Sequence, residues 1–188
     1  MPTKTKPAKV IFIDRDGVIN VDPIGDYIKS WEEFRFEEGT IEGLKELSTK
    51  GYDIIVVSNQ AGVGDGVYPE TELWRIHENM VDLFRKEKIR FRAAYYCVHG
   101  KSAGCGCRKP APGLFEKAAR EFSFHPQLTF FVGDKVSDLE AGKRFGLKTI
   151  FVRTGHGKFE ESKIPPHLKP DLICDSLKSA AALLPEAA

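Results

Sequence analysis

The chain has 188 residues with 28 Lys and Arg against 27 Asp and Glu, so its net charge is about +1, and 41% of its residues are hydrophobic. This composition excludes a disordered chain and binding to nucleic acid or an anionic membrane through bulk positive charge. No apolar run approaches the roughly 18 residues of a membrane-spanning helix, so we expect one cytoplasmic domain over residues 1–188, with a flexible basic tail at residues 1–8.

Six short apolar segments, rich in β-branched and aromatic residues, recur along the chain. Continuous apolar segments of this kind predict strands of a parallel sheet that is covered on both faces. In chain order they are residues 10–14, 52–59, 91–99, 129–134, 149–154 and 171–174.

Helical segments lie between these strands, with apolar residues at intervals of three and four. They are residues 40–50, 70–88, 112–122, 136–145 and 176–184. Residues 137–140 fit a capping box, and residues 155–170 are predicted to form a surface loop. Strands that alternate with helices predict an α/β fold with a doubly wound, Rossmann-like parallel sheet.

Acidic residues directly follow two of the predicted strands. Asp14 and Asp16 come after the first, and Asp134 and Asp138 come after the fourth. The carboxyl ends of the strands form the functional edge of such a sheet, so we expect these acids to gather there. Carboxylates that lie close together are costly without a cation, and Mg²⁺ prefers oxygen ligands. The sequence therefore predicts a magnesium site; simple turn and cap roles are disfavoured because both groups follow strands.

Four ordered segments resemble the motifs of the haloacid dehalogenase superfamily of phosphatases. They are residues 14–20, 58–60, 108–110 and 133–138, and the resemblance extends from about residue 10 to residue 154. Within the superfamily, the chain most resembles the phosphatases of D-glycero-D-manno-heptose 1,7-bisphosphate, with the histidinol-phosphate phosphatases as near relatives. The resemblance implies a haloacid dehalogenase fold and an Mg²⁺-dependent enzyme that removes the 7-phosphate from the heptose bisphosphate.

The resemblance also implies a role for each acid. Asp14 attacks phosphorus and forms an aspartyl-phosphate, which divides one difficult displacement into two. Asp16 protonates the leaving oxygen and later deprotonates the attacking water. Asp14, Asp16 and Asp134 hold Mg²⁺, with Lys135 next to the last of these ligands and Asp138 behind them.

Ser58 and Lys109 match the positions that stabilise the transferring phosphoryl group in this superfamily. Ser58 would offer its hydroxyl group, and Lys109 would offer a fixed positive charge. Outside the resemblance, Ser58 also suits a turn at the end of a strand, and Lys109 also suits a solvated surface position.

Three cysteines and one histidine lie within residues 97–107. Cys97, His99, Cys105 and Cys107 supply four sulfur and nitrogen ligands, a set that suits a structural Zn²⁺ ion. Disulfides are disfavoured because Cys105 and Cys107 are too close for an easy mutual bond and because the cytosol keeps thiols reduced. The pattern predicts a zinc loop that holds the residues after it in place, and the same loop is part of the resemblance.

The intervals between the motifs leave no room for a separate cap domain, so the chain resembles the capless members of the superfamily. Loops must then recognise the substrate, a small phosphorylated sugar. The candidate contacts are Asp22, Tyr27, Asn59, Gln60 and Arg108. Arg108 could bind a second phosphate in a bidentate manner or brace the zinc loop, and both interpretations stay open. All motifs can meet within one chain, so we expect a monomer.

Four other functions fit parts of this pattern. A nucleic-acid 3′-phosphatase shares the motif set. A histidinol-phosphate phosphatase shares the motifs. A phospho-receiver domain is also a doubly wound α/β fold with clustered acids, but the second acid at Asp16 and the cysteine-rich loop argue against it. A zinc-based nucleic-acid-binding module is disfavoured by the near-neutral charge.

Overall fold

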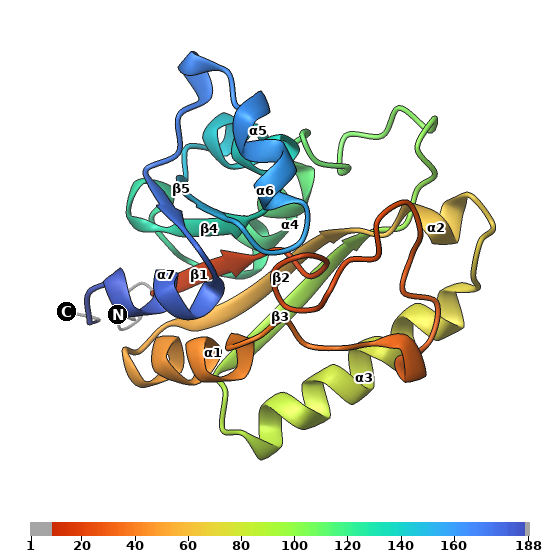
Figure 1. Cartoon of the computed structure of the whole chain (residues 1–188), viewed down its shortest axis with the longest axis horizontal. Helices are drawn as coiled ribbons and strands as arrows, with labels where there is room; N and C mark the ends of the chain where they lie inside the picture. The colour runs from red at the N-terminus through yellow and green to blue at the C-terminus, as the bar shows by residue number, and fades with distance from the viewer. Residues whose placement is uncertain (1–8, 187–188) are drawn as a thin grey trace, which may run out of the picture.

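The computed structural model of the chain describes residues 9–186, and the basic tail expected at residues 1–8 lies outside this range. Six strands form one sheet in the order β3-β2-β1-β4-β5-β6, and every neighbouring pair is parallel (Figure 1). They are β1 (Val10–Ile13), β2 (Asp53–Asn59), β3 (Phe91–Cys97), β4 (Phe130–Gly133), β5 (Lys148–Val152) and β6 (Leu172–Cys174). The predicted doubly wound parallel sheet is confirmed.

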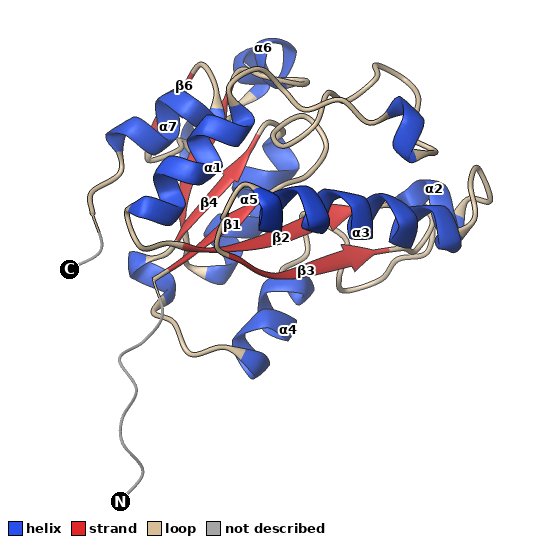
Figure 2. Cartoon of the chain, turned by 90° about the horizontal axis from the view of Figure 1, so that it is seen from below, coloured by secondary structure: helices blue, strands red, loops and turns tan. Residues whose placement is uncertain are grey.

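Helices cover both faces of the sheet (Figure 2). The longer ones are α1 (Thr40–Thr49), α3 (Glu70–Lys86), α4 (Gly113–Glu121), α5 (Val136–Phe145) and α7 (Leu177–Leu183). Buried residues of α1, α3 and α7 pack on one face, and those of α4 and α5 pack on the other. Each helix matches a predicted one to within two residues at either end. No helix in residues 9–186 is both long enough and apolar enough to cross a membrane.

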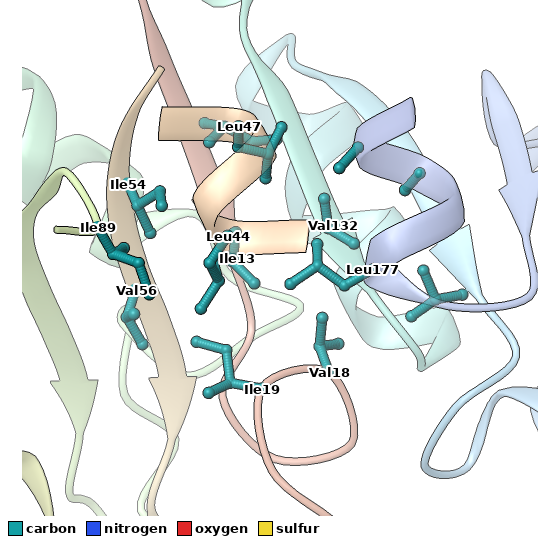
Figure 3. Close-up of a cluster of buried hydrophobic side chains, with 14 of the residues drawn as sticks. Ile13, Val18, Ile19, Leu44, Leu47, Ile54, Val56, Ile89, Val132 and Leu177 are labelled. Carbon is teal, nitrogen blue, oxygen red and sulfur yellow. The ribbon is translucent and has the colours of Figure 1, made fainter. Parts of the chain in front are cut away.

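Each face of the sheet carries its own apolar layer because successive side chains of a strand point to opposite faces. The layer beneath α1, α3 and α7 contains fully buried Ile13, Leu44, Leu47, Ile54, Val56 and Val132 (Figure 3). On the opposite face, Phe12 of β1 packs edge-on against Phe115 of α4, with ring centroids 5.0 Å apart. Burial on both faces is the reason that these strands are apolar at consecutive positions.

Several short elements were not predicted. Residues 155–170, expected to form a loop, contain α6 (Gly157–Glu160) and the 3₁₀ turns η3 (Glu161–Lys163) and η4 (Pro166–Leu168). A further single turn, α2 (Ala61–Gly64), follows β2. Elements of three or four residues are too short to show an apolar period in the sequence.

The capping box of α5 lies two residues earlier than predicted. The helix begins at Val136, so Ser137 belongs to its first turn. The backbone N–H of Lys135 donates to Asp138 Oδ2 at 3.0 Å, and Glu140 has no part in the box. Asp138 forms the box because its short carboxylate faces the start of the helix.

The carboxyl ends of β1 and β4 lie side by side at the point where the strand order reverses. Strands β2 and β3 extend the sheet on one side of this point, and β5 and β6 extend it on the other. Such a switch point is where doubly wound sheets bind ligands. Between Asp16 and Ser58, and between Ser58 and Lys109, the described chain forms only the helices and strands given above, one 3₁₀ turn and loops. Neither interval contains a cap domain.

Candidate active site

A cavity of about 410 Å³ opens at the carboxyl ends of the strands. The predicted site residues that line it are Asp14, Asp16, Asp22, Tyr27, Ser58, Asn59, Arg108, Lys109, Lys135 and Asp138. Gln60 and Asp134 are 1% and 0% exposed and are not part of the lining. The fold thus brings the predicted residues of all four motifs to one place.

Lys109 links two acids of this site. Its Nζ lies 2.8 Å from Asp14 Oδ1 and 2.7 Å from Asp138 Oδ1, and it donates to the carbonyl oxygen of Val57 at 3.1 Å. The side chain of Lys109 is 2% exposed. Burial opposes its charge, but the two carboxylates hold the pKa of Lys109 above its ordinary value. Lys109 is therefore a fixed buried cation and not a solvated surface residue.

Three acids form what we call the carboxylate cluster: Asp14, Asp134 and Asp138. Their ligand atoms all lie within 4.8 Å of one another. Asp134 Oδ2 accepts the backbone N–H of His156 at 2.8 Å, whereas its buried Oδ1 has no hydrogen-bond partner among the described residues. Burial raises the pKa of Asp14 to about 6 and raises that of Asp134 well above its ordinary value. Crowded carboxylates with one bare buried oxygen fit a divalent cation, which would supply the missing positive charge.

The oxygens of Asp138 are occupied in a different way. Oδ1 pairs with Lys109, and Oδ2 accepts the backbone N–H of Lys135. Asp138 is thus in reach of an ion in the cluster, but its Oδ1 is ion-paired with Lys109 and its Oδ2 accepts a hydrogen bond. This arrangement is compatible with the predicted supporting place behind the direct ligands.

Two glycines allow the chain to approach Asp134 closely. Gly17 has a φ of 88°, and a Cβ atom there would lie 2.2 Å from Asp134 Oδ2. Gly155 has a φ of 54°, and its Cβ would lie 2.5 Å from the same oxygen. Both the backbone conformation and the space therefore require glycine. The turn after β1 and the turn after β5 enclose the carboxylate between them.

Asp16 is held by its sequence neighbour Arg15, which is 1% exposed. Nε of Arg15 donates to Oδ1 at 3.0 Å, Nη2 lies 2.8 and 3.0 Å from the two oxygens, and Asn20 Nδ2 donates to Oδ1 at 3.0 Å. Burial favours the protonated acid, but Arg15 and these hydrogen bonds hold the pKa of Asp16 below its ordinary value. This contact between Arg15 and Asp16 was not predicted. Its only sign in the sequence is an arginine between two acids.

Two residues that were expected to touch substrate use their amide groups inside the protein. Asn59 lines the cavity, but its Oδ1 accepts the backbone N–H of Lys109 at 3.0 Å and its Nδ2 donates to the Lys109 carbonyl at 3.1 Å. Gln60 lies behind the lining, where it donates to Asp16 Oδ2 and Ser58 Oγ. The amide of Gln60 is thus bonded within the protein, and the amide of Asn59 fixes the backbone of Lys109.

Asp22 connects the loop at residues 20–27 to Lys135 and His156, which also line the cavity. Asp22 Oδ2 lies 2.7 Å from Lys135 Nζ and 3.1 Å from His156 Nε2. Burial opposes the charge of Lys135, but Asp134 and Asp22 hold its pKa above its ordinary value. Asp22 therefore anchors the loop as well as lining the cavity. His156 was not predicted because it lies in a segment that was expected to be a plain loop.

Two basic side chains of the cavity lining, Arg108 and Lys101, are more exposed than Lys109. Arg108 lines the cavity, and its buried Nη1 has no hydrogen-bond partner in the described part of the chain. Lys101, which the sequence analysis also missed, lies over the ring of Tyr27 with Nζ 5.5 Å from the centroid. An unpaired guanidinium nitrogen at a cavity suits an anionic ligand. This geometry favours phosphate binding by Arg108 over the alternative that Arg108 only braces the loop.

The four predicted zinc ligands form a second group, which we call the cysteine cluster: Cys97, His99, Cys105 and Cys107. The sulfur atoms are 3.3–3.6 Å apart, and His99 Nδ1 lies 3.2 Å from Cys107 Sγ and 3.6 Å from Cys97 Sγ. Tetrahedral zinc with Zn–S distances of roughly 2.3 Å separates its ligands by about 3.8 Å. All three thiols are free of disulfides, and none of the four residues lines the cavity. The cluster fits a closed, structural Zn²⁺ site.

The chain is similar to several known proteins. Residues 106–180 match the family described as HAD-hydrolase-like. The D-glycero-beta-D-manno-heptose-1,7-bisphosphate 7-phosphatase of Pasteurella multocida (strain Pm70) is 37% identical over 174 residues, which cover 89% of this chain and 94% of that protein. The D-glycero-alpha-D-manno-heptose-1,7-bisphosphate 7-phosphatase of Photorhabdus laumondii is 37% identical over 167 residues, or 82% and 88% of the two chains.

A solved structure shows the same likeness in three dimensions. The D,D-heptose 1,7-bisphosphate phosphatase from B. bronchiseptica, in complex with magnesium and phosphate, superposes with a TM-score of 0.86 at 29% sequence identity. The superposition covers 93% of this chain and 96% of that one. The fold and the sequence therefore point to the same group of proteins.

Proposed function

This chain belongs to the family of HAD-like phosphatases that includes the heptose-1,7-bisphosphate 7-phosphatases, and from this premise we propose that it removes the 7-phosphate of D-glycero-D-manno-heptose 1,7-bisphosphate. The observation that supports the proposal most is the buried Asp14–Lys109–Asp138 group at the cavity. Relatives named for the α and the β anomer are equally similar, at 37% identity. The proposal therefore covers both anomers.

The nucleophile in this proposal is Asp14, which forms an aspartyl-phosphate. The two polar contacts that the described residues make with its carboxylate, from Lys109 Nζ and from the backbone N–H of Arg15, both involve Oδ1. Oδ2 is therefore the oxygen that attacks phosphorus. The Lys109 contact keeps the attacking carboxylate ionised and fixes its direction.

Asp16 transfers protons in both steps. In the first step it protonates the oxygen that leaves with the sugar, and in the second it deprotonates the water that attacks the aspartyl-phosphate. Its clamp by Arg15 favours the ionised form in the absence of substrate. An incoming phosphate is itself anionic and raises the pKa of a neighbouring carboxyl group, which prepares Asp16 to carry the proton.

Two protein groups stabilise the transferring phosphoryl group. Lys109 supplies a positive charge that is already desolvated and in place. Ser58 Oγ accepts a hydrogen bond from Gln60 Nε2 at 3.0 Å, so its own O–H is left to donate into the cavity. Neither group has to reorganise when charge develops on the phosphoryl oxygens.

We assign the carboxylate cluster to Mg²⁺ and the cysteine cluster to Zn²⁺. Asp14, the backbone carbonyl of Asp16, and Asp134 would hold Mg²⁺, which neutralises charge on the nucleophile and on the phosphoryl oxygens. The bare Oδ1 of Asp134 supports this ligand set. The cysteine cluster would hold zinc away from the cavity and thereby fix the loop that precedes Arg108.

The second phosphate of the substrate would bind at the outer part of the cavity. Arg108 lines the cavity and has one buried nitrogen without a hydrogen-bond partner among the described residues, and Lys101 adds a second positive charge to the lining. Tyr27 offers an aromatic face against which the sugar can lie. A small bisphosphate thus meets several positive groups in the cavity lining.

The test is a comparison of kcat/KM for both anomers of the heptose 1,7-bisphosphate and for histidinol phosphate. We expect at least about tenfold preference for a heptose bisphosphate, because Arg108 gains a charge-assisted hydrogen bond only from the second phosphate. Equal or faster turnover of histidinol phosphate would assign the chain to the other enzyme. Absence of phosphate release from every one of these substrates would refute the proposal.

A further inference from the structure

The hydrogen bonds around Gln60 point to a role that sequence did not suggest. We infer that Gln60, oriented by Tyr68, is a positioning residue that holds the carboxylate of Asp16 in place for proton transfer. The inference rests on the proposed function only in so far as Asp16 is the proton-transferring group. It does not depend on which sugar phosphate is the substrate.

The side-chain amide of Gln60 uses all four of its hydrogen-bonding positions. Nε2 donates to Asp16 Oδ2 at 2.5 Å and to Ser58 Oγ at 3.0 Å. Oε1 accepts from Arg15 Nη2 at 3.0 Å and from the Tyr68 hydroxyl at 2.5 Å. Two hydrogens and two lone pairs are the full capacity of an amide. Gln60 therefore has no group left for substrate, and any effect on catalysis passes through its neighbours.

Only one orientation of this amide satisfies its surroundings. If the amide were rotated by 180°, its oxygen would face the Asp16 carboxylate and its NH₂ group would face the Arg15 guanidinium. The first contact would join two acceptors and the second two donors. The guanidinium and the Tyr68 hydroxyl both donate to Oε1, and they thereby direct Nε2 towards Asp16.

Tyr68 reaches Gln60 from the segment between α2 and α3 and is 5% exposed. Its ring fills the space beside α2, where a Cβ atom on Gly62 would lie 2.4 Å from Tyr68 Cε1. The position of the hydroxyl is thus set by close packing. Since Oε1 of Gln60 only accepts, the hydroxyl must donate to it.

Arg15 contacts both oxygens of the Asp16 carboxylate, and each oxygen has one further, neutral donor. Asn20 donates to Oδ1 and Gln60 donates to Oδ2. Without Gln60, Arg15 alone would hold Oδ2, and the orientation of the carboxylate would be less restrained. A misplaced general acid loses rate even when it keeps its charge, because proton transfer needs hydrogen-bond distance to the leaving oxygen.

The experiment separates proton transfer from the other steps by the choice of leaving group. A sugar alkoxide needs a proton to leave, whereas p-nitrophenolate leaves without one. The ratio kcat/KM covers only the steps up to departure of the leaving group, so the later attack by water does not enter it. The values of kcat/KM for both substrates are compared in wild type, Tyr68→Phe and Gln60→Glu. Asp16→Asn is the reference for complete loss of proton transfer by Asp16.

For Tyr68→Phe we expect kcat/KM for the sugar phosphate to fall about tenfold, while that for p-nitrophenyl phosphate stays within about threefold of wild type. Gln60→Glu keeps the acceptor for Tyr68, places an oxygen against Asp16 and removes the hydrogen bond to Ser58 Oγ. We therefore expect kcat/KM to fall about 100-fold for the sugar phosphate and by a smaller factor for p-nitrophenyl phosphate. The matched control is Tyr95→Phe. Tyr95 is also 5% exposed and donates its hydroxyl to a side-chain oxygen, that of Glu121 at 2.9 Å.

Equal losses on both substrates, or no loss on the sugar phosphate in Tyr68→Phe, would overturn the inference. Equal losses would mean that Tyr68 matters only for the stability of the fold. If Gln60→Glu does not fold, Tyr68→Phe still decides, since it removes one hydroxyl group. If wild type fails to hydrolyse the heptose bisphosphate, the proposed substrate is wrong, and the same comparison is made with a sugar phosphate that it does hydrolyse.

Discussion

The carboxylate cluster and the cysteine cluster lie at the same edge of the sheet but differ in ligand chemistry and in access. Asp14, Asp134 and Asp138 are almost fully buried oxygen donors, and two of them line the cavity. The cysteine cluster offers three sulfurs and one nitrogen, and no member of it lines the cavity. A hard, incompletely surrounded ion can exchange ligands with substrate, whereas four protein ligands close a zinc site. In the proposed assignment, the carboxylate cluster performs the chemistry and the cysteine cluster holds the loop.

The two clusters are connected through the chain. Cys107 is followed directly by Arg108 and Lys109, so the end of the cysteine loop supplies two of the cations that line the cavity. Asn59 fixes the Lys109 backbone from the neighbouring strand through two hydrogen bonds. A rigid loop therefore delivers its charges to a fixed place. Each of the following predictions tests one side of this division.

The largest expected effect belongs to the carboxylate cluster. In Asp14→Asn, kcat should fall by about 10⁴-fold or more because the amide cannot act as the nucleophile. Steady-state phosphate release and zinc content, measured on the same preparation, check this. Zinc should remain bound, since Asp14 is no part of the cysteine cluster. In the control Asp53→Asn, which changes an acid at the opposite end of β2, activity should be retained.

The next largest effect belongs to the cysteine cluster. Cys107→Ser should lose its zinc, lower the midpoint of thermal unfolding and raise KM for the bisphosphate by about tenfold or more, because Arg108 is no longer held. Metal analysis, a melting curve and steady-state kinetics measure the three effects. Cys174→Ser changes a buried cysteine outside the cluster and should keep its zinc. A Cys107→Ser protein with one zinc ion and normal kinetics would be incompatible with the proposed ligand set.

Arg108 tests the connection between the clusters. Arg108→Gln should lower kcat/KM for heptose 1,7-bisphosphate by about 10- to 100-fold, mainly through KM, because the variant loses a charge-assisted hydrogen bond to the second phosphate. For heptose 7-phosphate, which lacks that phosphate, the change should stay within about threefold. The control Arg92→Gln alters an exposed arginine that lies over the ring of Phe122. Equal losses on the two substrates would favour the earlier alternative, in which Arg108 braces the loop.

The smallest effect is expected for Lys101, an exposed side chain of the cysteine loop. Lys101→Met should raise KM for the bisphosphate about two- to fivefold, since an exposed ion pair contributes little. Its matched control is Lys148→Met, because Lys148 also lies over an aromatic ring, with Nζ 5.4 Å from the centroid of Phe130. A steeper salt dependence of KM in wild type than in Lys101→Met would confirm that the effect is electrostatic. An unchanged KM would remove Lys101 from the binding site.

The sequence predicted the parts of the site that follow directly from local order. Asp14 and Asp134 were placed correctly because each ends an apolar strand, and parallel strands bring their carboxyl ends to one edge. The cysteine cluster was predicted because its four ligands lie within residues 97–107. In both cases, residues that are neighbours in the sequence determine both the ligand chemistry and the place of the site in the fold.

The sequence failed where a side chain finds its partner far along the chain. Gln60 was expected at the substrate, but its partner Asp16 is 44 residues away and became visible only in the folded chain. His156 lies in a segment without an apolar period; its backbone N–H donates to Asp134, and its ring Nε2 lies 3.1 Å from Asp22. The start of α5 was predicted correctly, but its capping box was placed two residues too late, because Asp138 and Glu140 are equivalent cap residues until the backbone is known. Local patterns carry no information on such choices.

The division of labour between the two clusters is tested most directly by selective removal of metal. Brief treatment with a chelator, followed by gel filtration, should leave one zinc ion per chain and no phosphatase activity, and added Mg²⁺ should restore full activity. This result is expected because Mg²⁺ keeps several water ligands and dissociates readily, whereas zinc is enclosed by four protein ligands. Activity that falls in proportion to the zinc content and does not respond to Mg²⁺ would contradict the account.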